Sequence, residues 1–162
     1  MPVRGRNHPV IGLDLEGKTV AERHLQAAMN GLLGLADGDG RSLISEIRAS
    51  PTHSQVPIVV ISGGISGPGG LDAAALEVAD IVQKPFDQLR LQEALQIALR
   101  GTDEAVPSIL HVEDDLHVRQ IIGRFLPAHW NVCTVDSLSS ARQQLRTQTF
   151  DVVLLDLSLP DG

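Results

Sequence analysis

The chain has 162 residues, of which 43% are hydrophobic and 20% are charged, and its net charge is −7. That balance excludes a disordered chain, and the apolar runs are far shorter than the ~20 residues that cross a membrane, so no membrane partner is expected. The sequence shows neither a basic stripe nor an aromatic stacking platform, so we expect no direct contact with nucleic acid. A single cysteine, Cys133, excludes an internal disulfide and fits a cytoplasmic location.

Strands and helices are predicted to alternate over the first hundred residues. The predicted strands are residues 9–15, 56–62 and 80–83. The predicted helices are residues 19–29, 41–49, 71–78 and 91–99, the last with apolar residues at helical spacing.

The same alternation starts again after a predicted linker at residues 102–108. The predicted strands there are residues 109–112, 132–135 and 151–157, and the predicted helices are residues 116–126 and 138–146. Continuous apolar strands that alternate with helices indicate an α/β fold with a doubly wound parallel sheet. In such folds the functional side chains lie at the carboxyl ends of the strands.

Three carboxylates stand at strand ends in the second part of the chain. Glu113 and Asp114 directly follow one predicted strand, and Asp156 lies near the end of another. Neighbouring parallel strands bring such groups to one edge, where a hard cation such as Mg²⁺ relieves their mutual repulsion. The alternative is that residues 113–115 only cap the helix that follows, because acidic side chains favour helix N-termini.

The first part of the chain places complementary groups at its own strand ends. Ser62 ends one predicted strand, and Lys84 follows the next. A hydroxyl and an ammonium beside an acidic cluster are suited to phosphoryl transfer onto a carboxylate, because both stabilise the phosphoryl oxygens.

Four stretches resemble the receiver domain of two-component response regulators. Residues 109–115 (Ile-Leu-His-Val-Glu-Asp-Asp) and 152–162 (Val-Val-Leu-Leu-Asp-Leu-Ser-Leu-Pro-Asp-Gly) are similar to its first half. Residues 56–63 (Val-Pro-Ile-Val-Val-Ile-Ser-Gly) and 80–86 (Asp-Ile-Val-Gln-Lys-Pro-Phe) are similar to its second half. The resemblance implies a flavodoxin-like receiver fold built from halves that stand in reverse order.

The resemblance also implies the role of the acidic cluster. Asp156 resembles the residue that accepts a phosphoryl group from a histidine kinase or a histidine phosphotransfer protein. Glu113 and Asp114 resemble the pair that binds Mg²⁺, together with Asp156 and the backbone carbonyl of Ser158.

In the second half, Ser62 and Lys84 resemble the hydroxyl and the lysine that contact the phosphoryl group. They are 22 residues apart, as in the family. The family's switch aromatic is matched only by Ile81, so the resemblance does not extend to the usual aromatic signalling readout.

The order of the halves leaves two architectures open. Counting back from Ser62 by the spacing typical of the family leads to Leu32, so residues 1–101 resemble a partial receiver without an acceptor, and residues 109–162 the N-terminal half of another. The chain is then a piece of a tandem-receiver protein. In the alternative, the halves complete one permuted receiver, within one chain or in a domain-swapped homodimer.

Two other functions compete with a phosphoacceptor. Residues 12–19 fit the nucleotide-binding pattern Gly-x-x-x-x-Gly-Lys-Thr, although Asp14 and Glu16 put negative charge into an anion site. A receiver-like module that only dimerises, without phosphorylation, is the second alternative.

Overall fold

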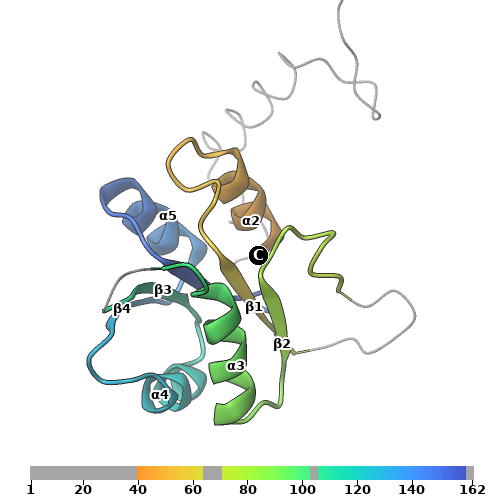
Figure 1. Cartoon of the computed structure of the whole chain (residues 1–162), viewed down its shortest axis with the longest axis vertical. Coiled ribbons are helices and arrows are strands. Elements are labelled where there is room, and N and C mark those ends of the chain that lie inside the picture. Colours follow the sequence, from red (N-terminus) through yellow and green to blue (C-terminus); the bar gives the residue numbers. More distant parts are fainter. Residues whose placement is uncertain (1–39, 64–70, 103–105, 160–162) are drawn as a thin grey trace, which may run out of the picture. The chain divides into compact units, whose positions relative to one another are not determined.

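Five parallel strands form one sheet at the centre of this protein (Figure 1). The computed structural model describes residues 40–63, 71–102 and 106–159. The strand and helix predicted before residue 40, the nucleotide-type pattern and Leu32 lie outside the described residues. None of the described helices is long and apolar enough to span a membrane.

Apart from the helix predicted at residues 71–78, helices and strands alternate as predicted, and most of their bounds lie within two residues of the expected ones. In chain order they are α2 (Gly40–Ala49), β1 (Ile58–Ser62), β2 (Asp80–Gln83), α3 (Gln88–Ala98), β3 (Ser108–Val112), α4 (Leu116–Phe125), β4 (Asn131–Val135), α5 (Leu138–Thr147) and β5 (Val152–Asp156). Ser108, predicted as the last residue of the linker, is the first residue of β3.

The strand order in the sheet is β2-β1-β5-β3-β4, and all pairings are parallel. The last strand of the chain, β5, therefore lies in the middle, between β1 from the first part and β3 from the second. Ile61 of β1 is the partner of Asp156, and Leu155 of β5 is also the partner of Val112 in β3. The doubly wound, flavodoxin-like fold is confirmed, and strands from both parts of the chain join in one sheet.

Two apolar cores hold the helices on the two faces of the sheet. On one face, Leu43 of α2 and Leu138 of α5 pack against β-strand side chains, and on the other face Leu91 of α3 and Ile122 of α4 do so. Each core contains side chains from both parts of the chain. The burial of β1 and β5 on both faces explains why their sequences are continuously apolar.

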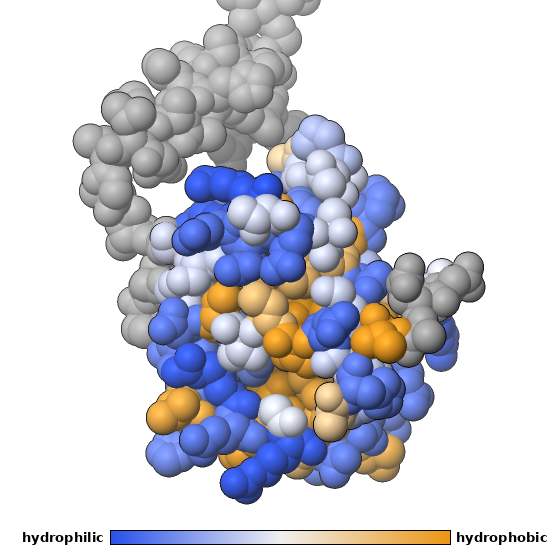
Figure 2. All heavy atoms as spheres, turned by 90° about the vertical axis from the view of Figure 1, so that its left-hand side faces the viewer, coloured by the Kyte–Doolittle hydropathy of each residue, from blue (hydrophilic) through white to orange (hydrophobic). Residues whose placement is uncertain are grey.

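The strand β4 is an edge of this sheet (Figure 1). Figure 2 views the side that carries it and shows apolar side chains between polar ones. Val132 of β4 is 36% exposed, whereas Val135 at the end of the same strand is buried.

The helix predicted at residues 71–78 is reduced to a single turn. The carboxylate of Asp72 accepts a hydrogen bond from the N–H of Ala74 and so begins the turn. The N–H of Val78 donates to the carbonyl of Ala73, and the N–H of Glu77 to that of Ala74, which closes it. Glu77 has a φ of 55°, the left-handed conformation that ends a helix.

Arg48 of α2 holds this turn from outside. Its Nε and Nη2 donate to the carbonyl of Glu77 at 2.9 and 2.6 Å, and its Nη1 donates to the carbonyls of Ser54 and Val56. Burial lowers the pKa of Arg48, and the nearby charge of Glu77 opposes that change. A tertiary contact therefore ends this segment after one helical turn, although its local sequence favours a longer helix.

Replacing Glu77 by Gly should raise the free energy of unfolding by about 1 kcal/mol, because glycine adopts a positive φ without the steric cost of a Cβ. Urea denaturation measures the change. Glu77→Ala is the matched control, since it removes the carboxylate but keeps the Cβ, and it should give no gain. Equal effects of the two substitutions would contradict the strain argument.

His111 is a polar group in the core beneath the strand ends. It is 1% exposed, its Nδ1 lies 3.5 Å from Thr134 Oγ1, and its Nε2 has no hydrogen-bond partner in the part of the chain that the structure describes. Burial, reinforced by the charge of Arg119, lowers the pKa of His111 to about 4. The imidazole is therefore neutral at pH 7.

Replacing His111 by Leu should raise the free energy of unfolding at pH 7 by about 1–2 kcal/mol, because an unpaired buried nitrogen loses its hydration without compensation. Thermal or urea unfolding measures this. His129→Leu makes the same change at an exposed histidine and should be close to neutral. A loss of stability in His111→Leu would show that the imidazole is satisfied in solution.

Candidate functional site

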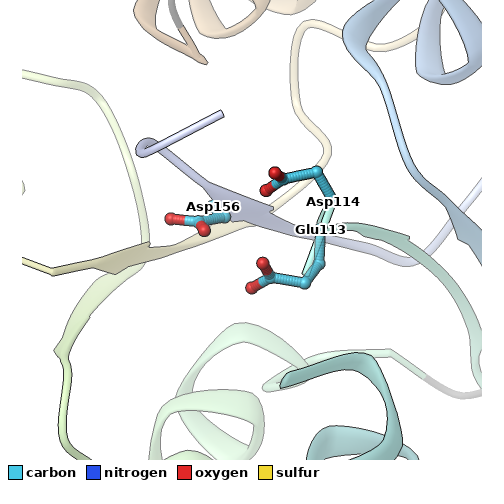
Figure 3. A group of neighbouring side chains, drawn as sticks. All are labelled: Glu113, Asp114 and Asp156. Atoms are coloured by element: carbon cyan, nitrogen blue, oxygen red, sulfur yellow. The ribbon is translucent and has the colours of Figure 1, made fainter. Parts of the chain in front are cut away.

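The three predicted carboxylates lie together at the carboxyl edge of the sheet (Figure 3). Asp156 is the last residue of β5, and Glu113 and Asp114 directly follow its neighbour β3. One oxygen from each carboxylate lies within 4.8 Å of the other two. Glu113 is 0% and Asp156 2% exposed, whereas Asp114 is half-buried.

Lys84 brings the first part of the chain to this cluster. It follows β2, and its Nζ lies 2.7 Å from Asp156 Oδ2 and 3.2 Å from Glu113 Oε2. Burial alone would lower the pKa of Lys84, but the hydrogen bond and charge of Asp156, together with Glu113, raise it above its usual value. The ammonium is thus held in its charged form between two buried acids.

Two serines lie beside Asp156: Ser62 ends the neighbouring strand β1, and Ser158 follows Asp156 by two residues. Ser62 is the buried last residue of β1, one position beyond Ile61, which pairs with Asp156. The N–H of Ser158 donates to Asp156 Oδ1 at 2.9 Å and so fixes that carboxylate from the other side. A Cβ on Gly63 would lie 3.5 Å from Ser158 Oγ, so the two chain segments approach each other beside the cluster.

Helix capping is separate from the acidic cluster. Asp115 alone caps α4, accepting hydrogen bonds from the N–H groups of His117 and Val118, which lower its pKa. The N–H of Asp115 in turn donates to Glu113 Oε1 at 3.2 Å. The capping alternative therefore applies to Asp115 and leaves Glu113 and Asp114 for the cluster.

The charges of the cluster are only partly compensated within it. Burial raises the pKa of Glu113 to about 7, and the negative charge of Asp156 adds to this, while Lys84 opposes it. The cluster contains one ammonium and three carboxylates, and two of these carboxylates are buried. An all-oxygen donor set with surplus negative charge fits a hard divalent cation such as Mg²⁺.

Mg²⁺ affinity should rise with pH and level off above pH 7. Below pH 7 the cation must displace the proton that burial keeps on Glu113, so we expect the affinity to fall by up to ~10-fold per pH unit. Without Mg²⁺, the raised pKa makes the folded state less stable as pH rises from 4.5 to 7, and Mg²⁺ should reverse this loss. Thermal shifts with and without Mg²⁺ at pH 5, 6, 7 and 8 test both expectations, and a stabilisation independent of pH would contradict them.

Gly40 supports the site and was not identified from the sequence. It is the first residue of α2, and a Cβ there would lie 2.7 Å from Leu157 Cδ2 and 3.2 Å from the carbonyl oxygen of Asp156. The start of α2 therefore packs directly on the backbone that carries Asp156. The signal in the sequence was its position: Gly40 ends a predicted turn and directly precedes the helix predicted at residues 41–49.

The comparisons with known proteins match the second part of the chain. The family model of the response regulator receiver domain matches residues 109–162. The swarming motility regulation protein RssB of Serratia marcescens is 45% identical over 56 residues, which are 34% of this chain and 26% of that protein. The match thus spans about a quarter of the length of that relative, and no solved structure matches the chain.

The matched residues supply β3, β4, β5 and all three carboxylates, whereas β1 and β2 supply Ser62 and Lys84 from the part that precedes the match. Both parts contribute to one sheet and to one cluster of side chains. Residues 109–162 of this chain are therefore similar to a response regulator receiver domain, and the part of the chain that the structure describes has a flavodoxin-like sheet of five parallel strands.

Proposed function

We propose that this chain is a phosphoacceptor in two-component signalling, and that Asp156 takes up a phosphoryl group from a histidine kinase or a histidine phosphotransfer protein. The observation that carries the proposal is the position of Lys84 Nζ, 2.7 Å from Asp156 and 3.2 Å from Glu113. An ammonium held at a buried carboxylate supports phosphoryl transfer, because it offsets the charge of the incoming oxygens.

In the proposed step, a carboxylate oxygen of Asp156 attacks the phosphorus of a phosphohistidine or of acetyl phosphate. A new P–O bond forms, the bond from phosphorus to the donor nitrogen or oxygen breaks, and the donor leaves with that electron pair. Lys84 neutralises part of the charge on the phosphoryl oxygens, and the hydroxyl of Ser62 donates a hydrogen bond to one of them. The N–H of Ser158 holds the second oxygen of Asp156 in place.

Glu113, Asp114, Asp156 and the backbone carbonyl of Ser158 are the groups that would hold Mg²⁺. When bound, the cation supplies charge neutralisation at the phosphoryl oxygens. Glu113 is oriented for this by the N–H of Asp115 on one oxygen and by Lys84 on the other. Their arrangement favours a phosphoacceptor over a receiver-like module that only dimerises, because such a module has no need of buried, uncompensated acids.

The position of the family's switch aromatic is occupied by an aliphatic side chain. Ile81 of β2 is half-buried against the core on the side of α2 and α5. We therefore propose that the phosphorylated state is transmitted without rotation of an aromatic ring at this position.

Incubation of the full chain with acetyl phosphate and Mg²⁺ tests the proposed function. We expect intact-mass spectrometry to show the gain of one phosphoryl group, which EDTA prevents and hydroxylamine removes, as for an acyl phosphate. The same treatment of urea-unfolded protein is the control, since the site then does not exist. No gain in mass in the presence of Mg²⁺, or a phosphoryl group that resists hydroxylamine, would overturn the proposal.

A further inference from the structure

The cluster of site residues is divided between two parts of the chain. Ser62 and Lys84 precede the connection between α3 and β3, and the three carboxylates follow it. The described contacts between the two parts are otherwise non-covalent. They consist of strand pairing, side-chain packing, hydrogen bonds and ion pairs.

The contacts between the two parts are extensive. The strands β1 and β5 pair over four residues, with backbone hydrogen bonds of 2.9 and 3.0 Å at the two ends. Arg142 of α5 forms two hydrogen bonds of 2.8 Å with the carboxylate of Glu46 on α2, and Leu145 O accepts a 2.7 Å bond from the ring of His53. Both apolar cores contain residues of both parts. All of these contacts are available to any copy of the complementary part.

The chain reverses direction after α3 at a residue suited to a hinge. Gly101 has a φ of 89°, a conformation that side chains other than glycine rarely adopt. The N–H of Thr102 donates to the carbonyl of Leu99 and completes the turn. If this turn opens, the two parts of one chain pack against parts of two different molecules. Each part then keeps all of its own internal contacts.

We propose that the site also assembles between two copies of this chain, which exchange their parts so that Ser62 and Lys84 of one copy complete the carboxylate cluster of the other. This inference rests on the proposed function in so far as labelling of Asp156 reports an assembled site. The exchanged dimer has two sites, each with the same contacts as the site within one chain.

Complementation between two variants with impaired sites, measured as the initial rate of labelling, tests the exchange. Asp156→Asn and Lys84→Ala chains are unfolded together, refolded and labelled with acetyl phosphate. In an exchanged heterodimer one site is wild type and the other carries both changes, so complete random exchange restores about a quarter of the wild-type labelling. The phosphoryl group should appear only on the Lys84→Ala chain and at the wild-type rate.

A second pair of variants is the matched control. Asp156→Asn and Glu113→Gln both alter the part that follows the hinge, and exchange moves that part as a unit. Every site of this mixture keeps one defect, so labelling should remain at the level of the separate variants. Restoration in this control, or no restoration in the first mixture while the wild type is labelled, would overturn the inference and leave the proposed function standing.

A charge reversal tests the exchange independently of phosphorylation. In a chain that has not exchanged its parts, either Glu46→Lys or Arg142→Glu places like charges together between α2 and α5. An exchanged heterodimer of the two pairs Lys with Glu at one interface and restores Glu46 with Arg142 at the other. Native mass spectrometry of the co-refolded mixture should show several-fold more heterodimer than either homodimer. Monomers only, or heterodimers at no more than the random share, would contradict the exchange.

Discussion

Asp156→Asn should abolish phosphorylation of this chain by acetyl phosphate, with the rate reduced by at least ~10³-fold. The amide has nearly the shape of the carboxylate but keeps only one oxygen. Lys84 and the N–H of Ser158 donate to different oxygens of Asp156, so one of them retains its acceptor and the other loses it. What the substitution removes is the negative charge and nucleophilicity of the attacking oxygen. The initial rate of mass gain in the presence of Mg²⁺ measures the loss.

Asp136→Asn is the matched control for this substitution. Asp136 directly follows β4, the strand beside β3, so it stands at the same edge of the sheet, but its side chain is exposed. Its rate of labelling should equal that of the wild type. Labelling of Asp156→Asn at the wild-type rate would place the phosphoryl group on another residue.

The sequence predicted the elements and the acidic cluster because both depend on local patterns. Continuous apolar runs identified the strands, and carboxylates at the ends of two of them had to meet if those strands were neighbours. Whether Lys84 would reach Asp156 depended on the pairing of β1 with β5, which are about ninety residues apart in the sequence. No local pattern determines such a pairing, so the sequence left several architectures open.

One error in the prediction has a tertiary cause and another has a local one. Residues 71–78 are rich in Ala and Leu, which favour a helix, but the contact of Arg48 with the carbonyl of Glu77 stabilises a left-handed residue after one turn. The start of α3, by contrast, had a local signal that was overlooked. Asp87 caps it by accepting a hydrogen bond from the N–H of Arg90, so α3 begins at Gln88, three residues before the predicted start at Leu91.

Lys84→Ala should slow phosphorylation by roughly 10²-fold while leaving Mg²⁺ binding at least as strong as in the wild type. The ammonium contributes most where negative charge accumulates on the phosphoryl oxygens during transfer. Towards a cation it acts in the opposite direction, because it repels Mg²⁺ and occupies oxygens of Glu113 and Asp156. If Lys84 acts in the transfer step, the substitution therefore lowers the labelling rate without lowering the Mg²⁺ affinity.

Arg90→Ala is the matched control, since it removes a cation whose partner is outside the cluster. Arg90 pairs with Asp80 through two hydrogen bonds of 2.8 and 2.9 Å, and it should affect stability more than labelling. If Lys84→Ala weakened Mg²⁺ binding and labelling to the same extent, the lysine would serve to hold the carboxylates in place. A slower rate with full Mg²⁺ affinity would instead show that Lys84 stabilises the transition state of the transfer. Its ammonium, 2.7 Å from Asp156, lies beside the phosphoryl oxygens that gain charge in that state.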